Sequence, residues 1–299
     1  AAGYDKNAEV PDGLLGLGFG FAGDGTVTPL AQPGNPKPRI FRLTEDEAVI
    51  NRLGFNNEGH DAAEKRLAAR KGRTGIVGVN IGANKDSADR IADYERGVLR
   101  FAALASYLTV NISSPNTPGL RNMQAREQLG ELLSRVMAAR AKAGAQPPVF
   151  LKIAPDLAEA ELEDIAAEVS ERDVDGVIVS NTTISRPPLK SVALAGETGG
   201  LSGKVLFERS TIVLAKMRKL LGPKRAIIGV GGVNSAESAL EKIRAGADLV
   251  QLYTSMIYAG PALPGRIVSG MSDAVGKEGL KSVRELRDQS LDRWAAKAL

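Results

Sequence analysis

The chain has no cysteine and only one histidine among its 299 residues. Without cysteine it can form no disulfide, no thiolate metal site and no cysteine nucleophile. The single histidine, His60, lies in a polar turn before a segment rich in Ala, Lys and Glu, and we interpret it as a surface or capping residue. The sequence therefore disfavours a Ser-His-Asp triad and a multi-histidine metal site. Any catalytic base must be a carboxylate, a lysine, a tyrosine or an activated hydroxyl.

Long apolar runs and a large excess of charge are also missing. No stretch approaches the roughly 20 apolar residues of a membrane-spanning helix, and no signal peptide is recognisable. The net charge is only +4, and Lys and Arg are scattered along the chain, which disfavours nucleic-acid binding. With 43% hydrophobic and 25% charged residues, the composition is typical of a globular protein.

Short apolar runs of strand length recur along the chain, each closing on small or polar residues. They are residues 19–27, 76–81, 107–112, 149–153, 177–179, 226–230 and 249–253. Apolar residues at helical spacing lie between most of them, for example Leu129, Leu132, Leu133, Val136 and Met137. Such alternation predicts a parallel sheet buried on both faces. Counting a truncated first strand at residues 1–3, eight units predict a single (β/α)₈ TIM-barrel domain spanning residues 1–299.

Two insertions break this rhythm. In residues 28–57 four prolines exclude a helix, and residues 39–43 and 48–50 are candidates for short strands. The second insertion, residues 185–203, ends in a glycine-rich segment. Both follow predicted strands, so we expect them over the C-terminal mouth of the barrel, where barrel enzymes carry their active sites.

Polar residues gather where the predicted strands end. They are Lys6, Thr26, Asn80, Asn111, Ser113, Ser114, Lys152, Ser180, Asn181, Thr182, Gly231, Gly232, Tyr253 and Thr254. A lone Asn at a strand end is usually a cap, but a whole rim of such groups indicates a site. This rim is rich in neutral hydrogen-bonding groups and poor in carboxylates, which suits an anionic, planar ligand better than a metal.

The run Gly229–Gly232 after a late strand is typical of a phosphate site, because backbone N–H groups can approach an anion closely there. Gly203 and the pair Tyr253-Thr254 are candidates to complete it. The alternative is that these glycines serve only a tight turn. By contrast, Gly18, Gly20 and Gly23 match a dinucleotide fingerprint but run into a strand rather than out of one, so we set that motif aside.

The segment from Asn111 to Arg121 is the densest in chemistry. Two prolines and a glycine stiffen a loop that carries two Ser, two Asn and one Thr directly after a strand. Asn amides can donate to and accept from amide-like ligands at once. Pro115 restricts Ser114 to extended geometry, which fixes the direction of its hydroxyl.

With this segment the chain resembles the dihydroorotate dehydrogenases, specifically their quinone-dependent class 2. The resemblance covers the whole chain in order. It rests on residues 1–7, 25–29, 32–36, 50–57, 80–82, 111–121, 151–156, 180–183, 199–203 and 229–232. Class 1 relatives use a cysteine base, which this chain cannot supply, so the serine is typical of class 2.

The resemblance implies an FMN-containing barrel that oxidises dihydroorotate to orotate in pyrimidine biosynthesis and passes electrons to a membrane quinone. By matching motif positions, it implies FMN contacts through Ala2, Gly3, Lys6, Thr26, Asn80, Asn111, Lys152, Ser180, Gly203, Gly232, Tyr253 and Thr254. It implies substrate contacts through Lys6, Asn51, Arg52, Leu53, Gly54, Phe55, Asn111, Asn116, Asn181 and Thr182. Ser114 would be the base, Thr117 with an ordered water its proton relay, and Lys152 a stabiliser of negative charge on the reduced flavin.

Two features depart from the family. Relatives carry an N-terminal segment that meets the membrane and shapes the quinone tunnel, and it is missing from this sequence. The resemblance implies peripheral association through that segment, on the cytoplasmic face of a bacterial inner membrane or on the mitochondrial inner membrane of a eukaryote, and a monomer.

At Gly23-Asp24, relatives have an acidic and then an aliphatic residue. Strand alternation predicts that Asp24 faces the barrel interior with Thr26 and has a hydrogen-bonding or cationic partner.

One alternative reading of the residues is a non-redox barrel lyase or isomerase. In it Lys152 would form a Schiff base with a sugar phosphate bound at the same glycine-rich site. This alternative leaves the asparagine-rich rim and Ser114 without a role.

Overall fold

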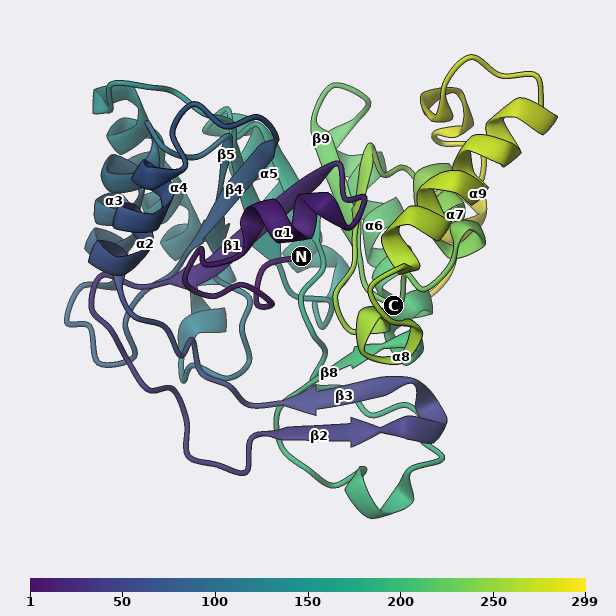
Figure 1. The fold of residues 1–299 in the computed structure, drawn as a ribbon, viewed down its shortest axis with the longest axis horizontal. Coiled ribbons are helices and arrows are strands. Elements are labelled where there is room, and N and C mark those ends of the chain that lie inside the picture. The colour runs from purple at the N-terminus through teal and green to yellow at the C-terminus, as the bar shows by residue number, and fades with distance from the viewer.

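A curled sheet of seven parallel strands forms the centre of the computed structural model, which describes all of residues 1–299 (Figure 1). In spatial order the strands are β1 (Phe21–Val27), β4 (Ile76–Ile81), β5 (Tyr107–Asn111), β6 (Val149–Ile153), β7 (Gly176–Val179), β9 (Ala226–Val230) and β10 (Leu249–Gln251). They coincide with the seven predicted apolar runs, so the predicted parallel, barrel-type α/β fold is confirmed.

The gap between β10 and β1 is occupied by the first residues of the chain. The Ala1 nitrogen donates to the Leu252 carbonyl at 2.7 Å, and the Asp5 carbonyl accepts from the Gly25 N–H, also at 2.7 Å. Gly3 has a φ of 110°, outside the range of a β-strand, so the segment turns instead of extending. The predicted eighth strand is therefore not formed, although its place in the barrel is filled.

Most of the helices cover the outer face of the sheet. The helices of the chain are α1 (Pro11–Gly16), α2 (His60–Ala69), α3 (Arg90–Phe101), α4 (Arg126–Lys142), α5 (Glu159–Glu171), α6 (Phe207–Leu221), α7 (Ala236–Arg244), α8 (Ser255–Ala259), α9 (Leu263–Lys277) and α10 (Leu291–Ala295). Two lie elsewhere: α10 packs on α6, and α8 contacts the first insertion, where the Tyr258 hydroxyl donates to the Ala48 carbonyl at 2.6 Å. A core of 47 buried residues lies between the sheet and this layer. Four of the five residues whose spacing predicted α4 are fully buried in it. None of the helices combines the length and hydrophobicity needed to cross a bilayer.

The inside of the curled sheet is closed at one end by a smaller cluster that contains Tyr107, Phe150 and Ile178. Gly78 makes room for it, because a Cβ there would lie 2.1 Å from the Tyr107 ring. The cluster leaves the opposite end, where the strands terminate, as the open mouth of the sheet.

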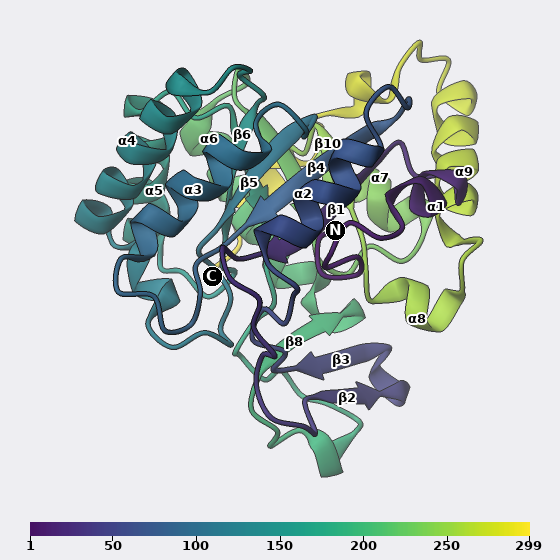
Figure 2. The ribbon, with the colours of Figure 1, turned by 60° about the vertical axis from the view of Figure 1, so that its left-hand side comes forward.

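A second, antiparallel sheet of three strands lies over that mouth (Figure 2). It consists of β2 (Ile40–Leu43), β3 (Ala48–Asn51) and β8 (Gly200–Gly203). The first insertion supplies β2 and β3, the second supplies β8, and a bridge between Thr183 and Leu201 ties β8 to the chain leaving β7. Both insertions thus lie where the sequence predicted, joined in one small sheet with its own buried core.

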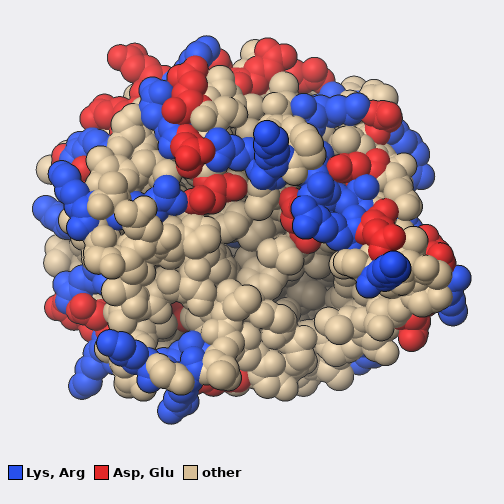
Figure 3. All heavy atoms as spheres, turned by 90° about the horizontal axis from the view of Figure 1, so that it is seen from above, with Lys and Arg blue, Asp and Glu red and all other residues tan.

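Charged side chains of both signs are intermixed on the face at the top of Figure 1 (Figure 3). Oppositely charged side chains pair at many positions of the protein, as in Arg140 with Asp175 at 2.5 Å and Arg244 with Glu278 at 2.7 Å. This face carries no extended patch of one sign.

Two predictions about single residues are wrong. His60 is buried, stands edge-on to Phe101 at 5.0 Å, and has its pKa lowered to about 4, mainly by burial. Asp24 is buried, but both of its carboxylate oxygens lack a hydrogen-bond partner. The register of β1 shifts between Gly25 and Val27, so strand alternation does not carry from Asp24 to Thr26. Burial and then Asp5 raise the pKa of Asp24 to about 8, although Arg70 and the chain's amino terminus act in the opposite direction.

Candidate active site

A cavity of about 350 Å³ lies between the carboxyl ends of the parallel strands and the small sheet. Residues from both ends of the chain and from both insertions contribute to its wall. Those predicted from the sequence that line it are Ala2, Asn51, Leu53, Lys152, Ser180, Asn181, Thr182, Gly203, Gly232, Tyr253 and Thr254. The structure therefore brings these strand-end residues together as expected for a barrel site.

A chain of hydrogen bonds joins several predicted residues beside the cavity. The Thr26 hydroxyl donates to Asn80 Oδ1 at 2.7 Å and accepts from the Asn111 amide at 2.9 Å. The Asn181 amide in turn reaches Asn111 Oδ1 at 3.3 Å and the Ser113 hydroxyl at 3.0 Å. Each amide is thus held in one orientation, which prepares the remaining donors and acceptors for a ligand.

Lys152 is the buried cation of this site. It ends β6 next to Asn111 of β5, is only 6% exposed, and makes neither a hydrogen bond nor an ion pair. Burial lowers its pKa to about 8. A buried ammonium without a partner is costly, so this wall of the cavity favours a ligand with negative charge.

The loop that carries Ser114 is buried against the first insertion. Ser114 is 6% exposed, and its hydroxyl accepts from the Asn116 N–H at 3.2 Å. The Asn116 amide donates to Asn51 Oδ1 at 3.3 Å, and the Asn35 amide donates to the Asn116 carbonyl at 3.1 Å. Thr117 is also buried, but no direct hydrogen bond joins it to Ser114. A proton relay between these two hydroxyls therefore requires a bridging group.

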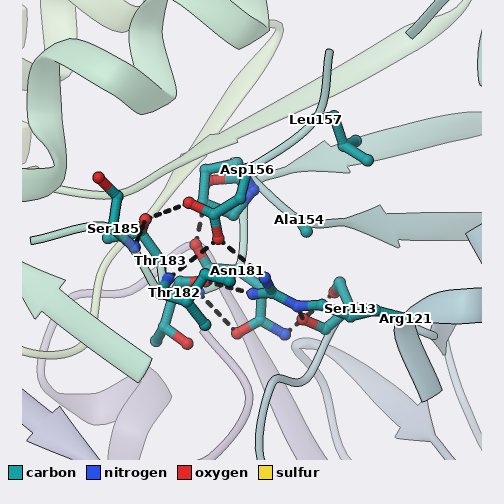
Figure 4. Close-up of polar contacts among 12 residues, drawn as sticks. Ser113, Arg121, Ala154, Asp156, Leu157, Asn181, Thr182, Thr183 and Ser185 are labelled. Carbon is teal, nitrogen blue, oxygen red and sulfur yellow. Dashed lines mark hydrogen bonds and ion pairs between the residues drawn. The ribbon is translucent and has the colours of Figure 1, made fainter. Parts of the chain in front are cut away.

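Arg121 holds three loops of the mouth together (Figure 4). Its guanidinium donates to the Ser113 carbonyl at 3.1 Å and to the Thr182 carbonyl at 2.9 Å, and it pairs with Asp156 at 2.8 Å. Asp156 also accepts from the Thr183 hydroxyl. Arg121 and Asp156 were not predicted as site residues. The available signal was their position, since each is the last residue of a segment that was singled out, 111–121 and 151–156.

The end of the cavity where the sequence predicts a phosphate site is lined by glycines whose surroundings leave no room for a side chain. A Cβ on Gly203 would lie 2.3 Å from the Glu47 carbonyl, and one on Gly232 would lie 2.4 Å from Phe207 Cβ. Beside them the Thr254 hydroxyl donates to the Ser202 hydroxyl at 2.8 Å. Gly203 and Gly232 therefore line the cavity with backbone alone, as suits an anion site.

Thr182 and Lys6 carry further polar groups of the predicted substrate side. The Thr182 hydroxyl is buried without a partner, and a Cβ on Gly200 would lie 2.0 Å from it. Lys6 is half-buried, and its pKa is lowered to about 8, first by burial and then by Arg39. Both groups lack a protein partner in this structure, as expected of groups that bind a ligand.

Three residues of the predicted substrate segment point elsewhere. Arg52 pairs with Glu197 at 2.7 Å and stacks on Phe41 at 4.5 Å. Gly54 packs on the Asn35 amide, and Phe55 packs against Gly82 with a φ of 54°. These residues pack within the first insertion or against Gly82 and do not line the cavity, and Gly3 similarly packs on the ring of Tyr253.

Comparison with known proteins gives a consistent result. The family model described as dihydroorotate dehydrogenase matches residues 1–275. A protein named dihydroorotate dehydrogenase (quinone) from Mesorhizobium japonicum is 84% identical over 299 residues, all of this chain and 83% of that protein. One of the same name from Brucella ovis is 66% identical over 303 residues, again covering 83% of its length.

Solved structures agree with this match. Ligand-free DHODH from Eimeria tenella is similar with a TM-score of 0.92 and 41% identity, over 97% of this chain and 87% of that one. The complex of the Eimeria tenella DHODH with ferulenol gives a TM-score of 0.91 at 41% identity, over 97% of this chain and 84% of that one. By these matches, and by the serine-bearing loop at the mouth of its barrel, this chain belongs to the dihydroorotate dehydrogenase family, in the quinone-dependent class.

Proposed function

We propose that this chain oxidises dihydroorotate to orotate in pyrimidine biosynthesis, with FMN bound in the cavity and a quinone as final electron acceptor. The observation that carries the proposal is one cavity that joins a glycine-built anion site to an amide-rich wall, with an uncompensated cation between them. Gly203 and Gly232 form the anion site, Asn51 and Asn181 belong to the amide-rich wall, and Lys152 is the cation between them.

The residues present fit FMN. Gly203, Gly232 and Thr254 would hold its phosphate, since they line the cavity together and no carboxylate does so. Lys152 would lie at the ring, where its ammonium gains the negative partner that the protein does not supply. FMN, when bound, accepts the hydride from the substrate.

The substrate would lie between the Ser114 loop and the amides of Asn111, Asn116 and Asn181. These amides match the donors and acceptors of a pyrimidine ring, and the Lys6 ammonium suits its carboxylate. Ser114 Oγ takes the C5 proton while the C6 hydrogen leaves as hydride, so a double bond forms and orotate results. Because Ser114 and Thr117 make no direct contact, we place an ordered water between them to carry the proton away.

We further propose that residues 1–299 fold as one domain and act as a monomer, peripheral to the cytoplasmic face of a bacterial inner membrane. The continuous seven-stranded sheet and the single large core support the domain assignment. The name of the relatives, which specifies a quinone, supports a membrane location because quinones are dissolved in the bilayer.

The visible spectrum of the purified protein tests the proposal. We expect flavin absorption that bleaches when dihydroorotate is added without oxygen and returns with a soluble quinone. A folded but colourless protein that binds no added FMN would contradict it. A borohydride-trapped adduct between Lys152 and a sugar phosphate would instead support a Schiff-base lyase.

A further inference from the structure

Lys242 is a second buried lysine, on the outer side of the sheet behind the glycine-built anion site. It is fully buried in α7 and makes no ion pair. Its ammonium donates to the Ser210 hydroxyl at 2.6 Å and lies 4.9 Å from the centre of the Phe207 ring. Gly229 of β9 makes room for the side chain, because a Cβ there would lie 3.4 Å from Lys242 Cβ. None of the roles described above uses this lysine.

Ser210 connects Lys242 to the peptide between Gly231 and Gly232. The Ser210 hydroxyl has one proton and three carbonyl acceptors in reach, Leu206 at 2.7 Å, Phe207 at 3.1 Å and Gly231 at 3.2 Å. In a trans peptide the carbonyl of Gly231 and the N–H of Gly232 point in opposite directions. The Gly231 carbonyl faces Ser210, and Gly232 lines the cavity, so this N–H is directed to the cavity side.

Close packing fixes this peptide in place. A Cβ on Gly231 would lie 2.6 Å from the Ser210 hydroxyl, and Gly232 is pressed against the Phe207 backbone in the same way. The Lys242 ammonium polarises the Ser210 hydroxyl, which strengthens the hydrogen bonds that this hydroxyl shares among its carbonyl acceptors, the Gly231 carbonyl included. A positive charge at Lys242 therefore makes the Gly232 N–H a stronger donor toward an anion in the cavity.

A buried ammonium with no acidic partner also needs an explanation. Burial lowers the pKa of Lys242 well below its ordinary value, which is the sign of a charge that the folded protein alone does not compensate. The cavity on the far side of the Gly231–Gly232 peptide offers a place for a compensating anion. An apolar side chain of similar length would pack there without this cost, so stability alone does not account for a lysine.

We propose that Lys242 is a positioning residue for the phosphate group of the bound flavin, acting through Ser210 and the Gly231–Gly232 peptide. The inference rests on the proposed function, because it takes FMN as the ligand. The proposal divides the affinity for FMN into two contributions. The cavity wall holds the ring and the ribityl chain, whereas binding of the phosphate depends in addition on the charge of Lys242, which makes no direct contact with it.

The test compares FMN with riboflavin, which lacks the phosphate, on protein freed of flavin. We expect Lys242→Met to weaken FMN binding about 10- to 100-fold, the range for losing a charge-assisted hydrogen bond, and to leave riboflavin binding within about twofold. Dissociation constants are measured by quenching of flavin fluorescence. The matched control is Lys216→Met, since Lys216 is a mostly buried lysine of α6 that pairs with Glu159 at 2.8 Å, and it should change neither constant.

Two further measurements separate positioning from a structural role. Flavin-free Lys242→Met should melt no lower than the parent protein, because an uncompensated buried charge is removed. Ser210→Ala keeps the lysine but interrupts the connection, and should also weaken FMN selectively. Equal losses for FMN and riboflavin, or unchanged FMN affinity in both variants, would overturn the inference. Failure of the parent protein to bind FMN would instead contradict the proposed function.

Discussion

Replacing Asp24 by valine is expected to stabilise the protein, and increasingly so as the pH rises. Asp24 is 1% exposed and neither of its carboxylate oxygens has a hydrogen-bond partner. Burial and the neighbouring Asp5 raise its pKa from 3.8 to about 8. The folded state therefore favours the protonated acid, whereas the unfolded chain is ionised at neutral pH.

The pH window and the magnitude follow from this shift. Because the folded pKa is raised, the contribution of the protonated acid to stability is complete below about pH 3.8 and is lost as the pH rises toward 8. At ~1.4 kcal/mol per pKa unit, ionisation of the unfolded chain costs at most about 4 kcal/mol at pH 7. Local relaxation and water entry reduce this, so we expect a gain of about 2 kcal/mol, or roughly 3 °C in melting temperature for a chain of 299 residues.

The assay is thermal unfolding of parent and variant at pH 5, 7 and 8.5. The difference in melting temperature should grow across this series. Asp5→Asn is the matched control of opposite sign, because the Asp5 carboxylate accepts backbone N–H groups from Glu9 at 2.9 Å and Val10 at 2.7 Å. A constant difference at all three pH values, or a less stable Asp24→Val at pH 8.5, would refute the reasoning.

Three further variants test the site. Ser114→Ala should slow flavin reduction by dihydroorotate by about 10²–10⁴-fold in stopped-flow absorbance while FMN stays bound, and near-normal reduction would remove Ser114 as the base. Arg121→Gln leaves Asp156 without its cation, and it should lower the free energy of unfolding by about 2–4 kcal/mol in chemical denaturation and also lower kcat. An unchanged free energy of unfolding would show that the three loops hold together without Arg121. Gly200→Ala places a Cβ on the Thr182 hydroxyl and should raise KM for dihydroorotate more than it lowers FMN affinity, whereas the reverse order would place Thr182 on the flavin.

The sequence predicted the strands well because each is a continuous apolar run, the pattern that a sheet buried on both faces demands. The two insertions were located by prolines and glycines, and their position after strands predicted the mouth. That both contribute strands to one sheet was not foreseen, because pairing between residues 48–51 and 200–203 leaves no periodic signal in either segment.

Single residues were harder to predict than elements. Asp24 was expected to have a hydrogen-bonding or cationic partner because a buried carboxylate without one is costly, yet neither of its oxygens has a hydrogen-bond partner. His60 was assigned to the surface because its neighbours are polar, yet the ring packs on Phe101 of another helix. Arg121 and Arg52 both lie in polar loop segments, so the sequence does not distinguish their roles. The fold shows that Arg121 joins the loops of the mouth, whereas Arg52 pairs with Glu197.

The three-stranded sheet over the mouth also determines how the cavity is assembled. Strand β8 pairs with β3, which lies about 150 positions earlier in the chain. The chain between these two strands contains β4 to β7, so β3 and β8 can pair only when those strands are in place. β8 has Gly203 of the anion site at one end, and at the other Gly200, which packs against Thr182 of the substrate side. The two binding regions therefore share one strand as a common support. We infer that neither region can be transplanted, shortened or redesigned by itself, and that fragments divided between the insertions will bind neither half of the ligand pair until they are recombined.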